Sequence, residues 1–149
     1  MIKLYYLFIT FVLLLFTQCS EKTTYKVGQE WSYKTRQGEE NSTLKILKIE
    51  EYPKEEQVIH ISIDQIKMEN PHSKEGIVEE LSHIPISKEA LDMSVTNLKN
   101  EKSQLPDFND GYNYWKKEFD KGNAGVFSIS VSEIVSGMEK NLISGDVID

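Results

Sequence analysis

Two hydrophobic periodicities, one after the other, limit the fold of this chain more than any other feature. Residues 31–84 contain β-branched runs in which apolar and polar side chains alternate, which is the period-two pattern of strands. Residues 88–142 carry apolar side chains at helical spacing. Because strand-type runs precede helix-type runs, the sequence predicts an α+β domain: an antiparallel sheet of four to five strands, mostly N-terminal, packed against about three C-terminal helices.

Four strands are expected in the first half of the chain, over residues 31–35, 44–49, 58–66 and 78–84. The third shows the clearest alternation, with Ile61 and Ile63 on one face and His60 and Ser62 on the other. We expect the isoleucine face to be buried and the face that carries His60 to be solvated. Pro85 interrupts the fourth run, where a turn is expected.

Two helices should follow these strands. Ser87 is a typical N-cap for the first, which we expect over residues 88–100. The second should be capped by Asn109 or Asp110 and run to about Lys121. Its aromatic residues share one stripe, which predicts that they face the core: Tyr112, Trp115 and Phe119.

The last part of the domain is expected to combine a short strand with a third helix. Residues 126–130 predict a fifth strand. Ser130 and Glu133 then match the capping box at the start of a helix. The residues that this helix should bury are Val131, Ile134, Val135, Met138 and Leu142. Residues 144–149 are expected to form a loose acidic tail.

A separate apolar run occupies residues 4–16 and is followed closely by the only cysteine, Cys19. Lys3 supplies a short basic start, and a polar stretch follows at residues 20–24, which completes the layout of a secretory signal. The run is shorter than the roughly 20 apolar residues that a spanning helix needs. A cysteine thiolate at this boundary is the nucleophile best suited to accept a lipid group.

Residues 1–20 resemble a bacterial lipoprotein signal peptide. Thr17 matches the usual pattern before the cysteine, whereas Phe16 and Gln18 depart from it. The resemblance implies cleavage before Cys19, lipidation of its sulfur, and a place in the bacterial cell envelope, at the outer membrane or facing the periplasm if the source is diderm. The alternatives are an ordinary secreted protein, an uncleaved anchor, or a run that forms part of the folded core.

This resemblance divides the chain into a signal peptide (1–18), a lipidated cysteine with a short tether (19–24), a single α+β domain (25–143) and the tail (144–149). Cleavage leaves 131 of the 149 residues and removes one lysine but no acidic residue, so the formal charge changes from −7 to −8. Such a surface repels nucleic acid and anionic lipid head groups. We therefore expect membrane attachment through the lipid alone, no nucleic-acid partner, and a preference for a basic protein.

No motif in the sequence identifies a reaction. His60, Ser62 and Asp64 have the side-chain types of a catalytic triad, but same-side residues on one strand stand roughly 6.5 to 7 Å apart, too far for the hydrogen bonds of a triad. His72 and His83 lie beside prolines, where we expect loops at one edge of the sheet. They are the candidate ligand- or partner-binding residues, and the alternative is that these loops have no binding role.

We expect no metal and no cofactor, because the spacings typical of zinc ligands are missing, and a site that combined the histidines with Glu79 and Glu80 would have to be assembled by the fold. Segments such as residues 31–44 and 111–130 resemble small uncharacterised bacterial exported proteins, which implies no activity. The sequence favours a lipid-anchored, non-catalytic binding protein, either of the immunity or inhibitor type or an envelope assembly factor. The alternative is a small envelope enzyme with a fold-assembled histidine and carboxylate site.

Overall fold

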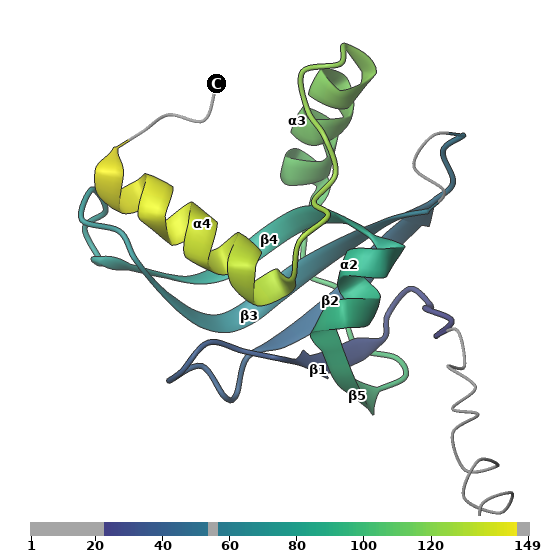
Figure 1. Cartoon of the computed structure of the whole chain (residues 1–149), viewed down its shortest axis with the longest axis horizontal. Helices are drawn as coiled ribbons and strands as arrows, with labels where there is room; N and C mark the ends of the chain where they lie inside the picture. Colours follow the sequence, from purple (N-terminus) through teal and green to yellow (C-terminus); the bar gives the residue numbers. More distant parts are fainter. Residues whose placement is uncertain (1–22, 54–56, 146–149) are drawn as a thin grey trace, which may run out of the picture.

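A computed structural model of the chain describes residues 23–53 and 57–145. Five strands form one antiparallel sheet in the order β4-β3-β2-β1-β5, which confirms the α+β class (Figure 1). The elements in chain order are β1 (Glu30–Tyr33), β2 (Thr43–Glu50), β3 (Val58–Glu69), β4 (Ile77–Ser87), α2 (Lys88–Ser94), β5 (Val95–Asn100), α3 (Asn109–Asp120) and α4 (Val131–Ser144). The predicted signal peptide, Cys19 and most of the predicted tail lie outside the described residues.

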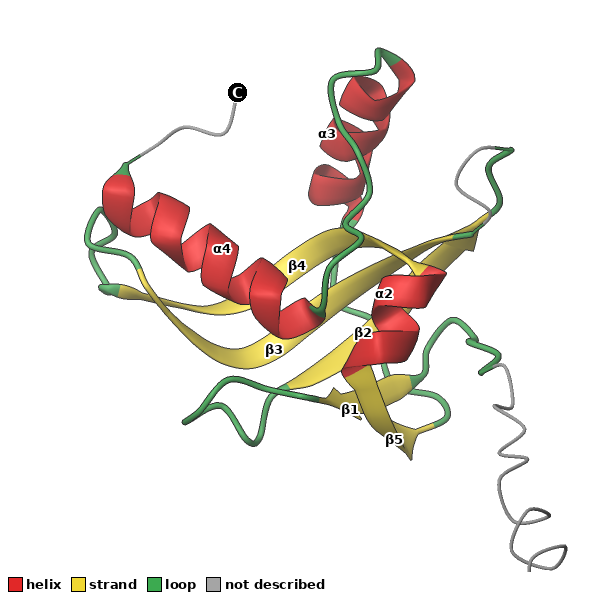
Figure 2. Cartoon of the chain, in the orientation of Figure 1, coloured by secondary structure: helices red, strands yellow, loops and turns green. Residues whose placement is uncertain are grey.

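The main core lies between one face of the sheet and two helices, α2 and α4 (Figure 2). Ile61 of β3 lies directly opposite Ile46 of β2 and Ile84 of β4, and each is at most 2% exposed. Leu91 of α2 and Ile134 of α4 pack into the same cluster. Fully burying a side chain of this size contributes about 1.5–3 kcal/mol, so this layer supplies much of the stability.

The predicted helix over residues 88–100 is only half correct. Ser87 caps it as expected and accepts a hydrogen bond from the backbone of Ala90, but α2 ends at Ser94 and the chain continues as β5. The carbonyl of Ser94 accepts from the backbone of Lys34, and Val95 pairs with Tyr33. Residues 95–100, whose helical spacing predicted a helix, therefore form a strand because they pair with the open edge of β1.

The fifth strand predicted over residues 126–130 is also wrong. Only Phe127 pairs with the sheet, through a single parallel bridge to Ile86. β4 instead continues through Pro85 to Ser87, so the proline does not end it. Proline is tolerated there because β4 is an edge strand of the sheet. The fifth strand is β5, on the opposite edge.

The two C-terminal helices confirm the sequence prediction closely. α3 begins at Asn109 and is followed by Gly122, whose φ of +80° suits the residue just after a helix. Its N-cap is Phe108, which makes no side-chain cap, rather than Asn109 or Asp110. α4 starts with the complete Ser130–Glu133 capping box. Its predicted inward residues are buried or packed against the core: Val131, Ile134, Val135, Met138 and Leu142.

The second face of β3 differs from the expectation of a solvated surface. Val58, His60 and Ser62 are all buried, and His60 is fully buried. The cover is α3, whose Trp115 ring lies 4.8 Å from the His60 ring. The sheet is therefore covered on both faces near this end of β3, by α2 and α4 on one side and by α3 on the other.

Candidate functional site

Polar side chains from three strands meet beneath α3. We call this set the histidine cluster, and it consists of Lys48, Glu50, His60, His83 and Tyr112. Its members come from β2, β3, β4 and α3 and are joined to one another by hydrogen bonds. It is the part of the described structure in which titratable groups are most densely connected.

Irregular strand pairing explains how these residues share one face. Ile46 pairs with Ile61 on the core side, but a bulge follows, so that Lys48 pairs with His60 on the opposite side. Without that bulge, Lys48 would lie on the same face as Ile46, because side chains alternate along a strand. A second irregularity lies between the pairs that Ile61 and Ile63 make with β4, in the segment that contains His83.

Glu50 is the acceptor at the centre of the cluster. Its Oε1 lies 2.9 Å from both the Tyr112 hydroxyl and Lys48 Nζ, and its Oε2 lies 3.0 Å from His60 Nε2 and 3.1 Å from the Tyr52 hydroxyl. Burial acts to raise the pKa of Glu50, but the hydrogen bonds from Lys48 and Tyr112 outweigh it and lower the pKa to about 2. Glu50 is therefore an ionised carboxylate with four donors.

The ionised Glu50 determines the direction of the hydrogen bonds that follow. His60 donates from Nε2 to Glu50, which leaves its Nδ1 as an acceptor, 2.9 Å from His83 Nε2. His83 therefore donates from Nε2. The proton positions that satisfy this network therefore give two successive hydrogen bonds: His83 donates to His60, and His60 donates to Glu50.

Both imidazoles are held in the neutral form. Burial lowers the pKa of His60, against the opposing effect of Glu50. Burial, together with the neighbouring His60, lowers the pKa of His83 to about 4. The two rings are stacked, with centroids 5.1 Å apart, so a second positive charge would lie next to the first. Neither ring is therefore a cation near neutral pH.

α3 fits over the cluster because of a glycine. A Cβ atom at Gly111 would lie 2.8 Å from Cβ of His83, closer than side chains normally pack. The rings of Tyr112, which directly follows Gly111, and of Trp115, one turn further on, contact His60 edge-on, with centroids 5.2 and 4.8 Å away. Lys48 Nζ lies 3.9 Å from the centre of the Tyr112 ring. Aromatic, cationic and hydrogen-bonding contacts thus hold the helix at one point on the sheet.

Few polar atoms of the histidine cluster remain free to bond to another molecule. Both nitrogens of His60 and both oxygens of Glu50 are already bonded. Among the imidazole nitrogens and the Glu50 oxygens of the cluster, only Nδ1 of His83 has no hydrogen bond in the described structure, and it reaches solvent. Among residues 23–53 and 57–145, no group of histidines, cysteines and carboxylates is arranged to hold a metal ion.

The predicted binding residues His72 and His83 are not brought together. His83 is part of the cluster but belongs to β4 rather than to a loop. His72 is exposed in the β3–β4 turn, where Gly145 at the end of α4 is close to its Nε2. The triad types His60, Ser62 and Asp64 do not form a triad either, because His60 bonds to His83 and Glu50 instead.

A second notable surface carries unpaired acidic groups on β3 and β4. Asp64 lies directly opposite Glu80, and within the described ranges neither forms an ion pair. Like charges placed opposite one another destabilise a sheet. Beside them, β3 bulges at Gln65, whose φ of +57° is rare for a residue with a side chain.

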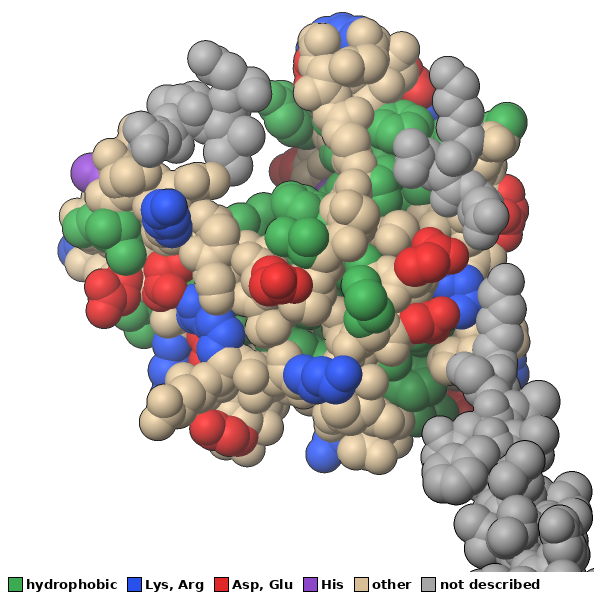
Figure 3. All heavy atoms as spheres, viewed as in Figure 1, with side chains coloured by type: hydrophobic (Ala, Val, Ile, Leu, Met, Phe, Trp, Pro, Cys, Tyr) green, Lys and Arg blue, Asp and Glu red, His purple; other side chains and the backbone are tan. Residues whose placement is uncertain are grey.

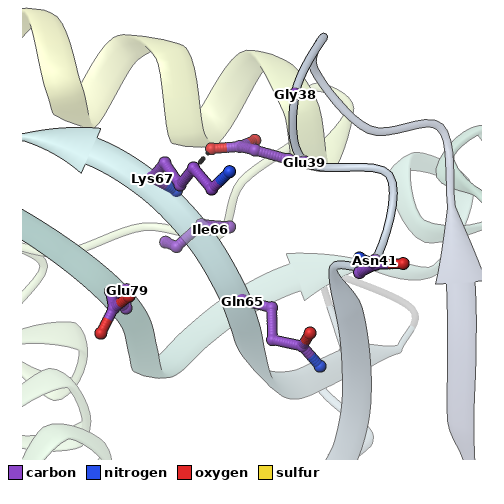
Figure 4. Close-up of a pocket in the computed structure, with 7 residues that line it drawn as sticks. All are labelled: Gly38, Glu39, Asn41, Gln65, Ile66, Lys67 and Glu79. Atoms are coloured by element: carbon purple, nitrogen blue, oxygen red, sulfur yellow. Dashed lines mark hydrogen bonds between the residues drawn. The ribbon is translucent and has the colours of Figure 1, made fainter.

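A pocket of about 190 Å³ opens beside this bulge (Figure 4). Figure 4 shows Gln65 and Glu79 on the two strands, and the backbone of Lys67 donating to Glu39. The complete lining is Gly38, Glu39, Asn41, Gln65, Ile66, Lys67 and Glu79. Because Glu39 is also bonded to Arg36, its charge is neutralised within the protein.

Comparisons with protein-family models, with curated proteins and with solved structures gave no match to this chain. None of the helices in the described part of the chain is long and apolar enough to cross a bilayer.

Proposed function

We propose that the protein is a lipid-anchored cell-envelope protein whose α+β domain binds a basic partner protein and catalyses no reaction. The sequence around Cys19 supports the anchor. The first buried residue of the domain, Tyr25, follows only six positions later, where its hydroxyl donates to Asp92 over 2.7 Å. The domain is therefore held close to the expected site of lipidation.

One observation carries the proposal of a basic partner: Asp64 and Glu80 lie opposite each other with no neutralising ion pair in the described structure. The exposed carboxylates of Glu69, Glu75 and Glu79 lie on the same two strands or in the turn between them. Uncompensated repulsion of this kind lowers stability, and proteins retain such costs mainly at functional sites. A basic partner would remove the repulsion on binding.

The histidine cluster supports a non-catalytic role. Four donors already satisfy Glu50, and His60 is bonded at both nitrogens beneath Trp115. Groups that are engaged in this way hold α3 in position, and neither His60 nor Glu50 has an unbonded ring nitrogen or carboxylate oxygen to offer a substrate. The binding surface and the structural cluster are then separate parts of the molecule.

The partner-binding proposal is tested by capture from envelope extracts with the lipidated protein. We expect the Asp64→Asn/Glu80→Gln variant to bind its partner at least about tenfold more weakly, because two charges that a basic partner neutralises are removed. Glu89→Gln, an exposed change on α2, is the matched control and should bind normally. Equal capture by both variants would contradict the proposal. A captured basic toxin or enzyme would favour the immunity type, and a captured envelope component the assembly type.

The anchor is tested separately by metabolic labelling with a palmitate analogue. Wild type should incorporate the label and partition with membranes, whereas Cys19→Ala should do neither, because the chain has no other cysteine to accept a lipid. Equal labelling of the two proteins would contradict the anchor without affecting the prediction about the acidic surface.

A second candidate function, a small envelope enzyme, is favoured by one observation. His83 presents an unbonded, solvent-reaching Nδ1 at the end of a chain that leads to a carboxylate. Such a chain orients a base in many hydrolases. Modification with diethyl pyrocarbonate, followed by mass spectrometry, separates the two candidates. The binding role predicts that the exposed His72 reacts well before His83, whereas preferential reaction of His83 would favour an enzyme.

A further inference from the structure

The sheet edge formed by β1 and β5 differs in charge from the rest of this acidic molecule. Residues 26–34 and 93–103 contain four lysines and two glutamates. The lysines are all exposed: Lys26, Lys34, Lys99 and Lys102. Three exposed apolar side chains flank them: Val27, Met93 and Leu98, at 51%, 53% and 37% exposure. We call these seven residues the lysine edge.

Contacts between three chain segments hold the lysine edge together. Leu98 pairs with Trp31 across β5 and β1, and Lys34 Nζ donates to the carbonyl of Met93 over 3.0 Å. The backbone of Ser103 donates to Gly28 over 2.7 Å, which places the segment of Lys102 beside that of Val27. Figure 3 shows lysine and apolar side chains near one another over β1 and β5.

The chain enters the domain at this same edge. Tyr25 packs edge-on against Trp31 of β1, with ring centroids 5.6 Å apart. Five residues separate it from Cys19, and the six extended steps between the two span about 20 Å. A lipid on Cys19 would therefore hold Tyr25, where the chain enters the lysine edge, within about 20 Å of the bilayer surface. The acidic β4 edge is four strand spacings away, or about 19 Å.

We propose that the lysine edge rests on an anionic lipid surface and so orients the domain, with the acidic strands β3 and β4 directed away from the membrane. This inference rests on the proposed lipid anchor. Lysines attract anionic head groups at short range, and exposed apolar side chains enter the interface between them. The total charge predicts repulsion from such a surface, but the local charge at the lysine edge has the opposite sign.

The test uses the lipidated full-length protein with a nitroxide label at one introduced cysteine. A lipidated Cys19 leaves no other free thiol, so Leu98→Cys and the matched control Glu80→Cys each carry a single label. Both proteins are reconstituted into vesicles of phosphatidylcholine, with or without phosphatidylglycerol. Accessibility to a water-soluble nickel chelate and to oxygen is then measured by electron paramagnetic resonance.

We expect the label at position 98 to be several-fold less accessible to the nickel chelate than the label at position 80, and only in vesicles that contain phosphatidylglycerol. Lys99→Gln/Lys102→Gln should remove this difference, whereas Lys117→Gln/Lys140→Gln, which changes two exposed lysines on α3 and α4, should not. Equal accessibility at the two positions would overturn the proposal. Protection of position 98 that persists in detergent would also overturn it and indicate a protein bound along β5.

The same samples distinguish a failure of this inference from a failure of the anchor. Mass spectrometry reports whether Cys19 carries a lipid. A lipidated Cys19 with equal accessibilities contradicts the orientation alone. An unmodified Cys19 thiol contradicts the anchor, and the proposed orientation with it.

Discussion

The two faces of β3 are both buried, but by different kinds of interaction. On one face, Ile61 packs with isoleucines of β2 and β4 beneath α2 and α4. On the other, His60 joins a chain of hydrogen bonds beneath α3. Apolar packing is non-directional and tolerates small movements, whereas a buried polar network requires all its partners in place. The first face therefore supplies stability, and the second determines where α3 lies.

The largest expected effect comes from opening a cavity on the isoleucine face. Ile61→Ala should lower the free energy of unfolding by about 2–5 kcal/mol, because the fully buried side chain leaves a space that its neighbours cannot fill. Urea denaturation measures the change. Ile77→Ala, at a position that is 44% exposed, should stay within about 0.5 kcal/mol of wild type. Similar losses for the two variants would contradict the description of the core.

The next effect comes from the centre of the histidine cluster. Glu50→Gln removes charge-assisted hydrogen bonds, including those from Lys48 and His60, and should lower the free energy of unfolding by about 1.5–3 kcal/mol. Glu51→Gln is the matched control, because the neighbouring Glu51 is exposed, and it should have little effect. If both changes were neutral, the polar face would not hold α3.

Replacing each of two helical glycines by alanine should change the free energy of unfolding in opposite directions. Gly111→Ala adds a Cβ that meets His83, so it should destabilise the protein by about 1–3 kcal/mol despite the better helix propensity of alanine. Gly137→Ala in α4 meets nothing within 4 Å and should stabilise by up to about 1 kcal/mol. Thermal unfolding of the two variants checks the difference. A stabilising Gly111→Ala would mean that α3 does not pack closely on β4.

Lowering the pH is the mildest way to disturb the polar face. The folded-state pKa values of His60 and His83 lie below the unfolded value of about 6.5, so the unfolded chain binds more protons and stability falls as the pH drops from about 7 to 4. Below about pH 4.5, Glu50 adds to the loss, because its folded-state pKa is also lowered. His83→Gln should flatten the upper part of this profile, which urea denaturation across this pH range measures. A profile that His83→Gln leaves unchanged would contradict the assignment.

The sequence predicted the parts of the fold that depend on local patterns. The alternation of Ile61 with His60 placed β3, and the Ser130–Glu133 capping box placed the start of α4. Pairing between distant segments decided the rest. Residues 95–100 became a strand because the edge of β1 was open, which no helical periodicity in that segment could indicate.

The histidine cluster was beyond sequence analysis for the same reason. Two strand irregularities place Lys48 and His83 near His60, and bulges of this kind leave no mark in a hydrophobic pattern. One local signal was present: Gly111 stands inside a helix beside aromatic residues, which is typical of a close approach between backbone and a neighbouring element. The partner of that approach, His83, became known only from the fold.

The central claim is that a chain of hydrogen bonds from neutral His83 through neutral His60 to Glu50 holds α3 on the sheet. Long-range ¹⁵N–¹H spectra of the imidazole rings test it directly, because they report the tautomer and the charge of each ring. We predict protons on Nε2 of both His60 and His83, and titration of both rings below the ordinary pKa of histidine, with His83 near 4. A His60 proton on Nδ1, or titration of either ring near its ordinary pKa of about 6.5, would contradict the account.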